Sequence, residues 1–401
     1  MPSQLEGVSH LDRVEAENGN LGRMYAVGVM SFILFLSTLV GVPVLPRLST
    51  ELGADRTDIP MVVSSALVTV VVLQFFTGVL ADRYSRRTLI LVSSLLGSAT
   101  SLLCAVATHW SQLLILRIAG GAADAIAMPA ILAITASLGE GRQGRFFGIL
   151  RSSQGLSFVV GPMLGSAFSL VSLRTPFVVD GILSLAVFVV ALFVMPGREA
   201  ASPGHRLSLL RGLKRTFAER RVYLYLLLGV SGLFAFGILF SFVPAKAEVL
   251  GLESWQVGAI LGFGALIYSV VSFFAGRLSD NVSRRMLVVV SEMAMLVAVA
   301  GLHVASGFAL LVAFYGLFCV GEASVCLLSF AYAAKVFDKE QIGTSMGAFD
   351  SVMDLSLFAG PVLGALLYKT TGLTGPVFLL ASLPAICALF AASLWLTLDA
   401  K

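Results

Sequence analysis

Long runs of apolar residues, separated by short polar breaks, extend along almost the whole chain. Each run is about 20 residues or longer, which is the length that an α-helix needs to cross the apolar part of a bilayer. The runs are continuous rather than alternating, which argues against the strands of a membrane β-barrel. The pattern predicts twelve membrane-spanning helices, over residues 24–46, 58–80, 88–107, 112–137, 146–169, 175–195, 222–245, 255–276, 286–305, 308–334, 341–367 and 375–398.

The composition favours the same class of protein. Hydrophobic residues make up 57% of the 401 residues and charged residues 12%, whereas soluble domains have about 45–50% and 25%. The chain has no soluble segment large enough for an active site, and no metal-ligand spacing, nucleophile motif or phosphate-binding loop. We therefore expect no enzyme, no cofactor, no metal and no nucleic-acid partner. The expected energy source is an ion gradient.

The distribution of Lys and Arg predicts the orientation. Of the 27 basic residues, 20 fall in segments on the side of the N-terminus, five fall on the other side, and Arg117 and Arg151 lie within spans. Because loops rich in Lys and Arg stay in the cytoplasm, both termini are predicted to be cytoplasmic. The chain is expected to be a multi-pass protein of the (inner) cell membrane.

The same pattern divides the chain into four parts. These are a cytoplasmic N-terminal tail (1–23), two six-helix bundles (24–195 and 222–401) and a basic cytoplasmic linker between the bundles (196–221). Apolar residues recur in the linker at helical spacing, at Leu207, Leu210, Leu213 and Phe217. This spacing fits a helix on the membrane surface or a plain connection.

The two halves repeat each other at an offset of about 198 residues. Gly78-Val-Leu-Ala-Asp82-Arg-Tyr-Ser-Arg86-Arg87 recurs as Gly276-Arg-Leu-Ser-Asp280-Asn-Val-Ser-Arg284-Arg285, and Gly161-Pro162-Met-Leu-Gly165 recurs as Gly360-Pro361-Val-Leu-Gly364. Asp124 falls opposite Glu322. Transporter folds are commonly built from such repeats, with the substrate site between them.

These motifs resemble those of the major facilitator superfamily, and most closely its twelve-span drug:proton antiporter branch. The Gly78–Arg87 loop resembles the superfamily signature between spans two and three, with Ser85 where Gly is usual. Arg117-Ile-Ala-Gly120-Gly121 resembles the antiporter motif of span four, and Gly155 to Gly165 resembles that of span five. The resemblance implies an all-α membrane protein of two pseudo-symmetric six-helix bundles, which functions as a monomer by alternating access.

The resemblance also implies a cytoplasmic gate. Asp82 can pair with Arg residues and with the positive N-terminal end of a neighbouring helix. Arg151 and Asp350 are expected to form a latch between the halves. The proposed gate residues are Gly78, Asp82, Arg83, Arg86, Arg87, Arg151, Asp280 and Asp350. The alternative is that the arginines only mark the cytoplasmic side.

Ionisable residues within spans predict the substrate cavity, because such groups normally face a cavity or a partner. Arg117 and Asp124 share one face of span four, and Glu322 shares a stripe of span ten with Tyr315. In the superfamily fold these spans line the central cavity, so Asp124 and Glu322 are expected to face each other across it. Burial favours the uncharged carboxyl group, so each can carry a proton. Asp354 is the reserve candidate, and structural hydrogen bonds are the competing interpretation.

Small residues and prolines predict close helix packing. The residues of this motif are Gly155, Gly161, Pro162, Gly165, Gly360, Pro361 and Gly364. On span five the glycines form a stripe that fits a seam between the halves. Asp180 and Glu292, on spans that are usually peripheral, are assigned structural roles.

The sequence therefore predicts a secondary active transporter that exports a small amphipathic or cationic compound in exchange for protons. Its partners would be the substrate, protons and the lipid bilayer. The alternatives are export of one specific metabolite, lipid or sugar, and a membrane sensor that does not transport. The substrate, the direction of transport and the choice between protons and sodium stay open at this level.

Overall fold

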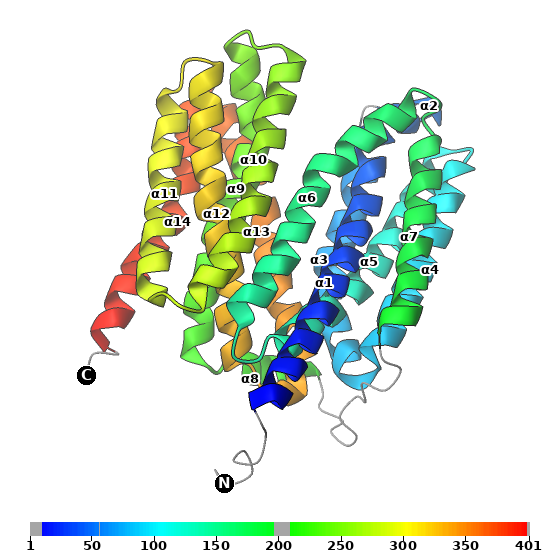
Figure 1. Ribbon diagram of the computed structural model, residues 1–401. Helices are drawn as coiled ribbons and strands as arrows, with labels where there is room; N and C mark the ends of the chain where they lie inside the picture. The colour runs from blue at the N-terminus through cyan, green and yellow to red at the C-terminus, as the bar shows by residue number, and fades with distance from the viewer. Residues whose placement is uncertain (1–9, 56, 196–208, 399–401) are drawn as a thin grey trace.

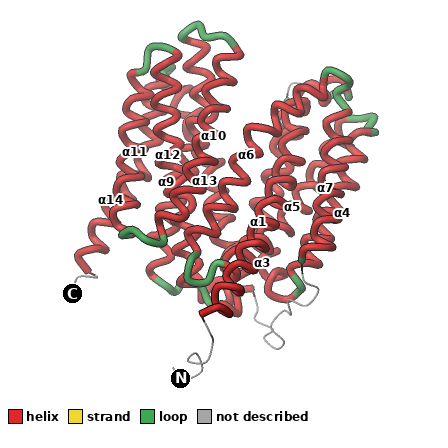
Figure 2. The backbone as a smooth tube through the Cα atoms, viewed as in Figure 1, coloured by secondary structure: helices red, strands yellow, loops and turns green. Residues whose placement is uncertain are grey.

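The computed structural model describes residues 10–55, 57–195 and 209–398, which form helices joined by short loops and contain no β-strand (Figures 1 and 2). This confirms the predicted all-α fold for the described residues. The elements are α1 (His10–Gly41), η1 (Val42–Val44), α2 (Leu45–Glu51), α3 (Ile59–Arg83), α4 (Arg86–Ala105), α5 (Trp110–Leu138), α6 (Gln143–Ser169), α7 (Thr175–Val194), α8 (Leu209–Thr216), α9 (Arg220–Val249), α10 (Ser254–Ser279), α11 (Arg284–Val304), α12 (Phe308–Val336), η2 (Lys339–Gln341), α13 (Ile342–Thr371) and α14 (Thr374–Leu398).

Eleven of the twelve predicted spans each coincide with one long helix, with most ends agreeing within a few residues. The first, 24–46, covers the second part of α1, η1 and the start of α2. The breaks are at residues that end helices. Pro43 lies in the 3₁₀ turn that separates α1 from α2, and Gly372 takes a left-handed backbone conformation that ends α13.

The start of the first helix differs from the prediction. Helix α1 begins at His10, so the described part of the predicted tail is helical. No proline interrupts the chain between His10 and Gly41. Residues 1–9 of the predicted tail lie outside the described residues.

Eleven of the helices described are long and apolar enough to cross a membrane. Helix α6 is not among them, although it has 27 residues. It carries Arg145, Arg151 and Gln154 together with several serines, which lower its hydropathy. The structure therefore describes a multi-pass membrane protein and gives eleven candidate spans by length and composition.

The helices form two groups. Helices α1 to α7 lie together on one side, and α9 to α14 lie on the other (Figure 1). The groups meet at the end of the molecule that carries the start of α1 and helix α8, and they diverge toward the opposite end (Figures 1 and 2). We call the first of these the closed end. Across it, α3 packs against α13 and α6 packs against α10.

The predicted linker contains a short helix, α8, at the closed end. The hydroxyl groups of Thr216 and Ser345 lie 2.8 Å apart, and Arg215 forms an exposed ion pair of 3.2 Å with Asp338. These contacts attach α8 to the start of α13. Residues 196–208 of the linker, including Leu207, lie outside the described residues.

Candidate functional site

Asp82, at the closed end of α3, holds the first turn of α13 in the other group of helices. The backbone N–H groups of Gly343 and Thr344 donate to its two carboxylate oxygens at 2.7 Å each, and the Thr344 hydroxyl donates at 2.5 Å. The first N–H groups of a helix lack partners within the helix, and the helix dipole attracts negative charge there. Asp82 therefore joins the two groups of helices through a charged cap.

Asp280, at the end of α10, makes the corresponding contact in the opposite direction. The backbone N–H groups of Gly144 and Arg145, in the first turn of α6, donate to its carboxylate at 3.1 and 2.9 Å. Each group thus supplies one aspartate that caps a helix of the other group. The two copies of the repeated motif therefore make the same kind of contact. The sequence of the degenerate second copy did not reveal this.

The glycines of the same motif allow these helices to touch. A Cβ atom on Gly78 would lie 2.7 Å from the carbonyl oxygen of Gly343, and one on Gly276 would lie 2.5 Å from the carbonyl oxygen of Gly144. Backbone therefore packs on backbone at both crossings. Any side chain at either position would push the two helices apart.

Arg86 and Arg87 of the motif have partners within their own group. Arg86 donates to the hydroxyl of Ser137 at 2.8 Å, and Arg87 donates to the backbone carbonyl of Leu192 at 2.7 Å. They connect the start of α4 to the ends of α5 and α7. Arg83 is exposed at the last residue of α3. These two contacts support the closed end from within one group of helices.

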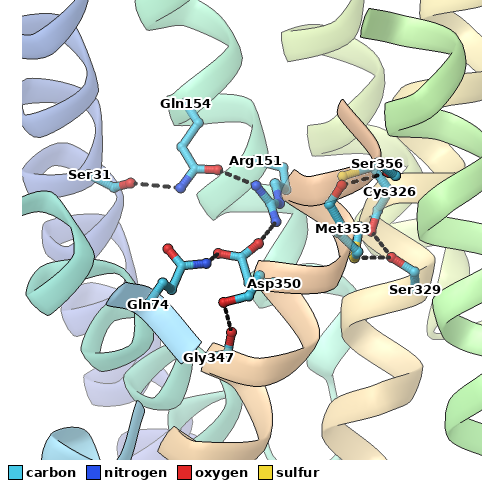
Figure 3. A network of polar contacts seen from close by, with 11 residues as sticks. Ser31, Gln74, Arg151, Gln154, Cys326, Ser329, Gly347, Asp350, Met353 and Ser356 are labelled. Atoms are coloured by element: carbon cyan, nitrogen blue, oxygen red, sulfur yellow. Dashed lines mark hydrogen bonds and ion pairs between the residues drawn. The ribbon is translucent and has the colours of Figure 1, made fainter. Parts of the chain in front are cut away.

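The expected latch between Arg151 and Asp350 is present, deeper between the two groups (Figure 3). Arg151 of α6 lies 3.6 Å from the carboxylate of Asp350 on α13, and its guanidinium lies 4.2 Å from the centre of the Phe330 ring. Asp350 also accepts a hydrogen bond of 2.8 Å from Gln74 of α3. Both members of the ion pair are nearly buried, with side-chain exposures of 11% and 4%.

Two glutamines of this network were not predicted. Gln74 binds Asp350, and Gln154 accepts from Arg151 at 2.9 Å and donates to Ser31 at 3.2 Å (Figure 3). Both are buried. The feature of the sequence that could have indicated them is a single amide side chain within an apolar run. Asp354, one turn beyond Asp350, lies within electrostatic reach of Arg151.

Glu322 lies inside the second group of helices, with a relative exposure of 2%. It packs beside Gly232 of α9. Within the described part of the chain, its Oε2 atom has no hydrogen-bond partner. Tyr315, expected in the cavity, instead packs against Gly264 of α10 and stacks on Phe318 at 6.3 Å between ring centres. The large ring fills the space that this glycine leaves.

Asp124 does not face Glu322 in this conformation. It accepts a hydrogen bond of 3.3 Å from Thr38 of α1 and lines a small polar pocket within its own group, together with Arg117 and Asp180. The expectation that the two acids face each other across one cavity is therefore not met. The shared helical face of Arg117 and Asp124 was predicted correctly, but this face points to α1 and α4.

The Gly-Pro motifs also pack differently from the expected seam. A Cβ on Gly155 would contact Tyr268 of α10, in the other group, at 2.5 Å. Gly161 and Gly165 instead face Leu39 and Val40 of α1, in their own group. Pro162 and Pro361 lie inside α6 and α13 without ending them, and Gly360 and Gly364 face α9 and Phe242 on it. Only the Gly155 end of the stripe belongs to the seam, because α6 passes from α10 to α1 along its length.

Membrane-length helices in two groups, joined by buried charges and helix caps at one end, define a multi-pass membrane protein. The family model described as Major Facilitator Superfamily matches residues 27–327 and 256–401. The chain belongs to this superfamily, and it is a transporter rather than an enzyme.

Known relatives place the similarity in the drug-efflux branch, as predicted. The quinolone resistance protein NorA of Staphylococcus aureus (strain MSSA476) is 27% identical over 242 residues, 59% of this chain and 62% of NorA. Multidrug resistance protein 2 of Bacillus subtilis (strain 168) is 22% identical over 268 residues, 64% of this chain and 66% of that protein. The match thus spans less than two thirds of the length of these curated relatives.

Solved structures of the superfamily share the fold. The human organic anion transporter MFSD10 (TETRAN) has a TM-score of 0.77 at 20% identity, over 92% of this chain and 99% of that chain. The transporter FucP in its outward conformation has a TM-score of 0.78 at 13% identity, over 94% and 99%. At these identities the likeness shows the fold alone.

Proposed function

We propose that this chain exports a small amphipathic or cationic compound in exchange for protons, by alternating access. The observation that carries the proposal is Glu322, a carboxyl group buried in a long apolar helix with no ion pair to any of the described residues. Such groups are costly in a membrane and normally serve transport. The names of the relatives, which describe quinolone and multidrug resistance, support an amphipathic substrate.

We propose that α6 is the twelfth span and that the spans form two pseudo-symmetric six-helix bundles, 24–195 and 222–401. The paired caps from Asp82 and Asp280 support the symmetry, because each bundle makes the same contact to the other. The bias of Lys and Arg supports placing the closed end, both termini and the 196–221 linker on the cytoplasmic side. The membrane would be the inner cell membrane.

With this orientation, the structure is an outward-facing state. The two aspartate caps and the Arg151–Asp350 latch keep the cytoplasmic side shut. Protons from outside reach the buried acids and neutralise them, so a cationic substrate loses its counter-charge and leaves. Deprotonation in the inward-facing state restores the charge and favours substrate capture. Differential affinity of the two states for proton and substrate couples binding to the conformational change, and the proton gradient drives the cycle.

The test is transport by the purified chain in proteoliposomes, across a panel of cationic, neutral and anionic amphiphiles. When a pH gradient is imposed, we expect cationic members to move in the direction opposite to the proton flow. A sodium gradient alone should not move them. The neutral variants Asp124→Asn and Glu322→Gln should reduce the gradient-driven rate at least about tenfold, since a coupling acid cannot be replaced by an amide. Asp354→Asn tests the reserve candidate.

Glu248→Gln is the matched control, because Glu248 is an exposed carboxyl group at the end of α9. It should transport as the wild type does. If Asp124→Asn and Glu322→Gln, singly and together, transport with the same dependence on the pH gradient as the wild type, the assignment of the coupling acids is wrong. Transport of a single neutral metabolite, lipid or sugar would favour the specific exporter. Absence of transport across the panel would favour the sensor.

A further inference from the structure

A polar pocket lies within the first group of helices, away from the contact between the two groups. Helices α1, α4, α5 and α7 enclose it, with Ala66 of α3. Three charged residues line it: Arg117 and Asp124 from α5, and Asp180 from α7. Its volume is about 20 Å³, which is room for about one water molecule. The pocket is therefore too small for an organic substrate.

The hydrogen bonds in the pocket converge on the two carboxyl groups. Ser101 donates to Asp180 at 2.7 Å, and Ser184 lies 3.4 Å from its other oxygen. Thr38 donates to Asp124 at 3.3 Å. Asp180 has a relative exposure of only 4%. Two carboxyl groups thus line one small pocket, the buried Asp180 and the half-buried Asp124, with few donors for each.

Unsatisfied polar groups also point to an occupant. The hydroxyl of Ser93, with a relative exposure of 1%, lines the pocket and has no hydrogen-bond partner among the described residues. The same holds, over the described ranges, for the Nε atom of Arg117. Buried polar groups are normally hydrogen-bonded, often through ordered water. One water molecule in the pocket would satisfy such groups.

The charges in the pocket do not balance. The titratable or charged groups that act on Asp180 are Arg117 and Asp124 from α5 and the Cys104 thiol from α4. The lining from α1 and α3 consists of Leu34, Ser37, Thr38 and Ala66, which carry no charge. One guanidinium neutralises one carboxylate, and a second ionised carboxylate would remain buried without a counter-charge.

We propose that this pocket binds one proton, held by Asp180 or by Asp124 beside Arg117, and that Asp180 is a proton-binding residue rather than a structural one. The proton completes the neutral set of two carboxyl groups and one guanidinium. A metal cation suits the pocket less well, because Arg117 repels it and the hydroxyl donors already serve the carboxylates. The use of this proton in transport rests on the proposed function, but its binding does not.

The experiment counts protons taken up by the purified full-length chain in detergent, as a weakly buffered solution is brought from alkaline to mildly acidic pH. It needs neither substrate nor gradient. Asp180→Asn should take up one proton fewer than the wild type, because Asp124 then pairs with Arg117. Arg117→Gln should take up one proton more, because both carboxyl groups then lack a counter-charge. The double variant Arg117→Gln/Asp180→Asn should match the wild type.

Asp180→Glu is the matched variant that keeps a carboxyl group, and it should keep the wild-type uptake. Circular dichroism and size-exclusion chromatography check that each variant is folded. If Asp180→Asn does not fold, the Arg117→Gln and Asp180→Glu results decide. Equal uptake by folded wild type, Asp180→Asn and Arg117→Gln would overturn the proposal. So would release of the proton by sodium chloride but not by choline chloride in the wild type, which would show a sodium site.

The outcome is independent of the transport assay. Transport without pH dependence would contradict the proposed function and leave the proton count unchanged. Unchanged proton counts with pH-dependent transport would contradict this pocket and leave the exporter in place.

Discussion

At the scale of single residues, the closed end depends on carboxylates that meet helix N-termini in the other group. Asp82 accepts three hydrogen bonds from the first turn of α13, and Asp280 accepts two from the first turn of α6. These bonds are charge-assisted, and the helix dipole adds to them. Because they cross between the groups, they exist only while the closed end is shut.

Replacing Asp82 by Asn is therefore expected to destabilise the closed end by about 1 kcal/mol, the usual cost of losing a helix cap. The amide can offer only one oxygen to the two N–H groups. Distances between spin labels at the closed ends of α3 and α13 should shift toward an open population. Asp58→Asn is the control, since Asp58 precedes α3 without capping it through its side chain. An unchanged distance distribution in Asp82→Asn would remove the gate role.

The buried latch predicts an asymmetric response to mutation. Asp350→Ala leaves the guanidinium of Arg151 buried without its counter-charge, which is expected to cost about 3–5 kcal/mol. The double variant Arg151→Leu/Asp350→Leu removes both charges and should recover most of that loss. The melting temperature in detergent measures both the loss of stability in Asp350→Ala and its recovery in the double variant. A double variant no more stable than Asp350→Ala would show that the charge pair does not account for the loss.

At the scale of elements, two helix crossings set the distance between the groups. Helix α10 touches α6 through Gly276, Gly144 and Gly148, and α3 touches α13 through Gly78 and Gly343. Helices in lipid gain little from burying apolar surface against each other, so close backbone contact is a main source of their affinity. The crossings and the caps therefore act together, because each cap can form only where the backbones are this close.

Gly276→Val tests the crossing of α6 and α10. Its side chain would meet the backbone of Gly144 and Gly148, at an expected cost of about 1–3 kcal/mol. The matched control is Gly262→Val on the same helix, because a Cβ there meets nothing within 4 Å. Cysteine cross-linking between the closed ends of α6 and α10 should weaken in the first variant only. Equal cross-linking in both would show that this crossing tolerates a side chain.

At the scale of the whole molecule, the number of spans depends on α6, which has 27 residues but is not among the eleven candidate spans. Its two arginines lie where it meets the second group, Arg145 in the turn capped by Asp280 and Arg151 beside Asp350. A helix of this kind can cross a bilayer when its polar residues face protein rather than lipid. With α6 as a twelfth span, as proposed, both ends of the chain would lie on one side of the membrane.

Reporter fusions after Gly141 and Ser172, on either side of α6, measure this crossing. The first should report the cytoplasm and the second the opposite side, while fusions after Ala200 and Lys401 should both report the cytoplasm. The physical reason is the charge bias of the loops, which retains Lys and Arg inside. If the reporters after Gly141 and Ser172 lie on the same side, α6 does not cross the membrane. The chain then has eleven spans, and its two termini lie on opposite sides.

Much of the site was visible in the sequence. The motif around Asp82 and the pair Arg151–Asp350 lie where the repeat indicated. Asp280 was harder to assign, because its motif has lost the arginine that stands at position 83 in the first copy. Gln74 and Gln154 carry no motif. Only the partners that they meet across the interface distinguish them from isolated polar residues.

The sequence by itself determined the helices, their order and the two-fold repeat. In lipid, a long apolar run satisfies its backbone groups only as a helix or as a strand of a closed barrel. Barrel strands alternate apolar and polar residues, so the continuous apolar runs of this chain indicate helices. Tertiary structure decided which neighbour each helical face meets. Helical periodicity placed Arg117 and Asp124 on one face, but packing turned that face to α1 and α4 and brought Asp180 to it. Periodicity defines a face within one helix, whereas the partner of that face depends on how all the helices pack together.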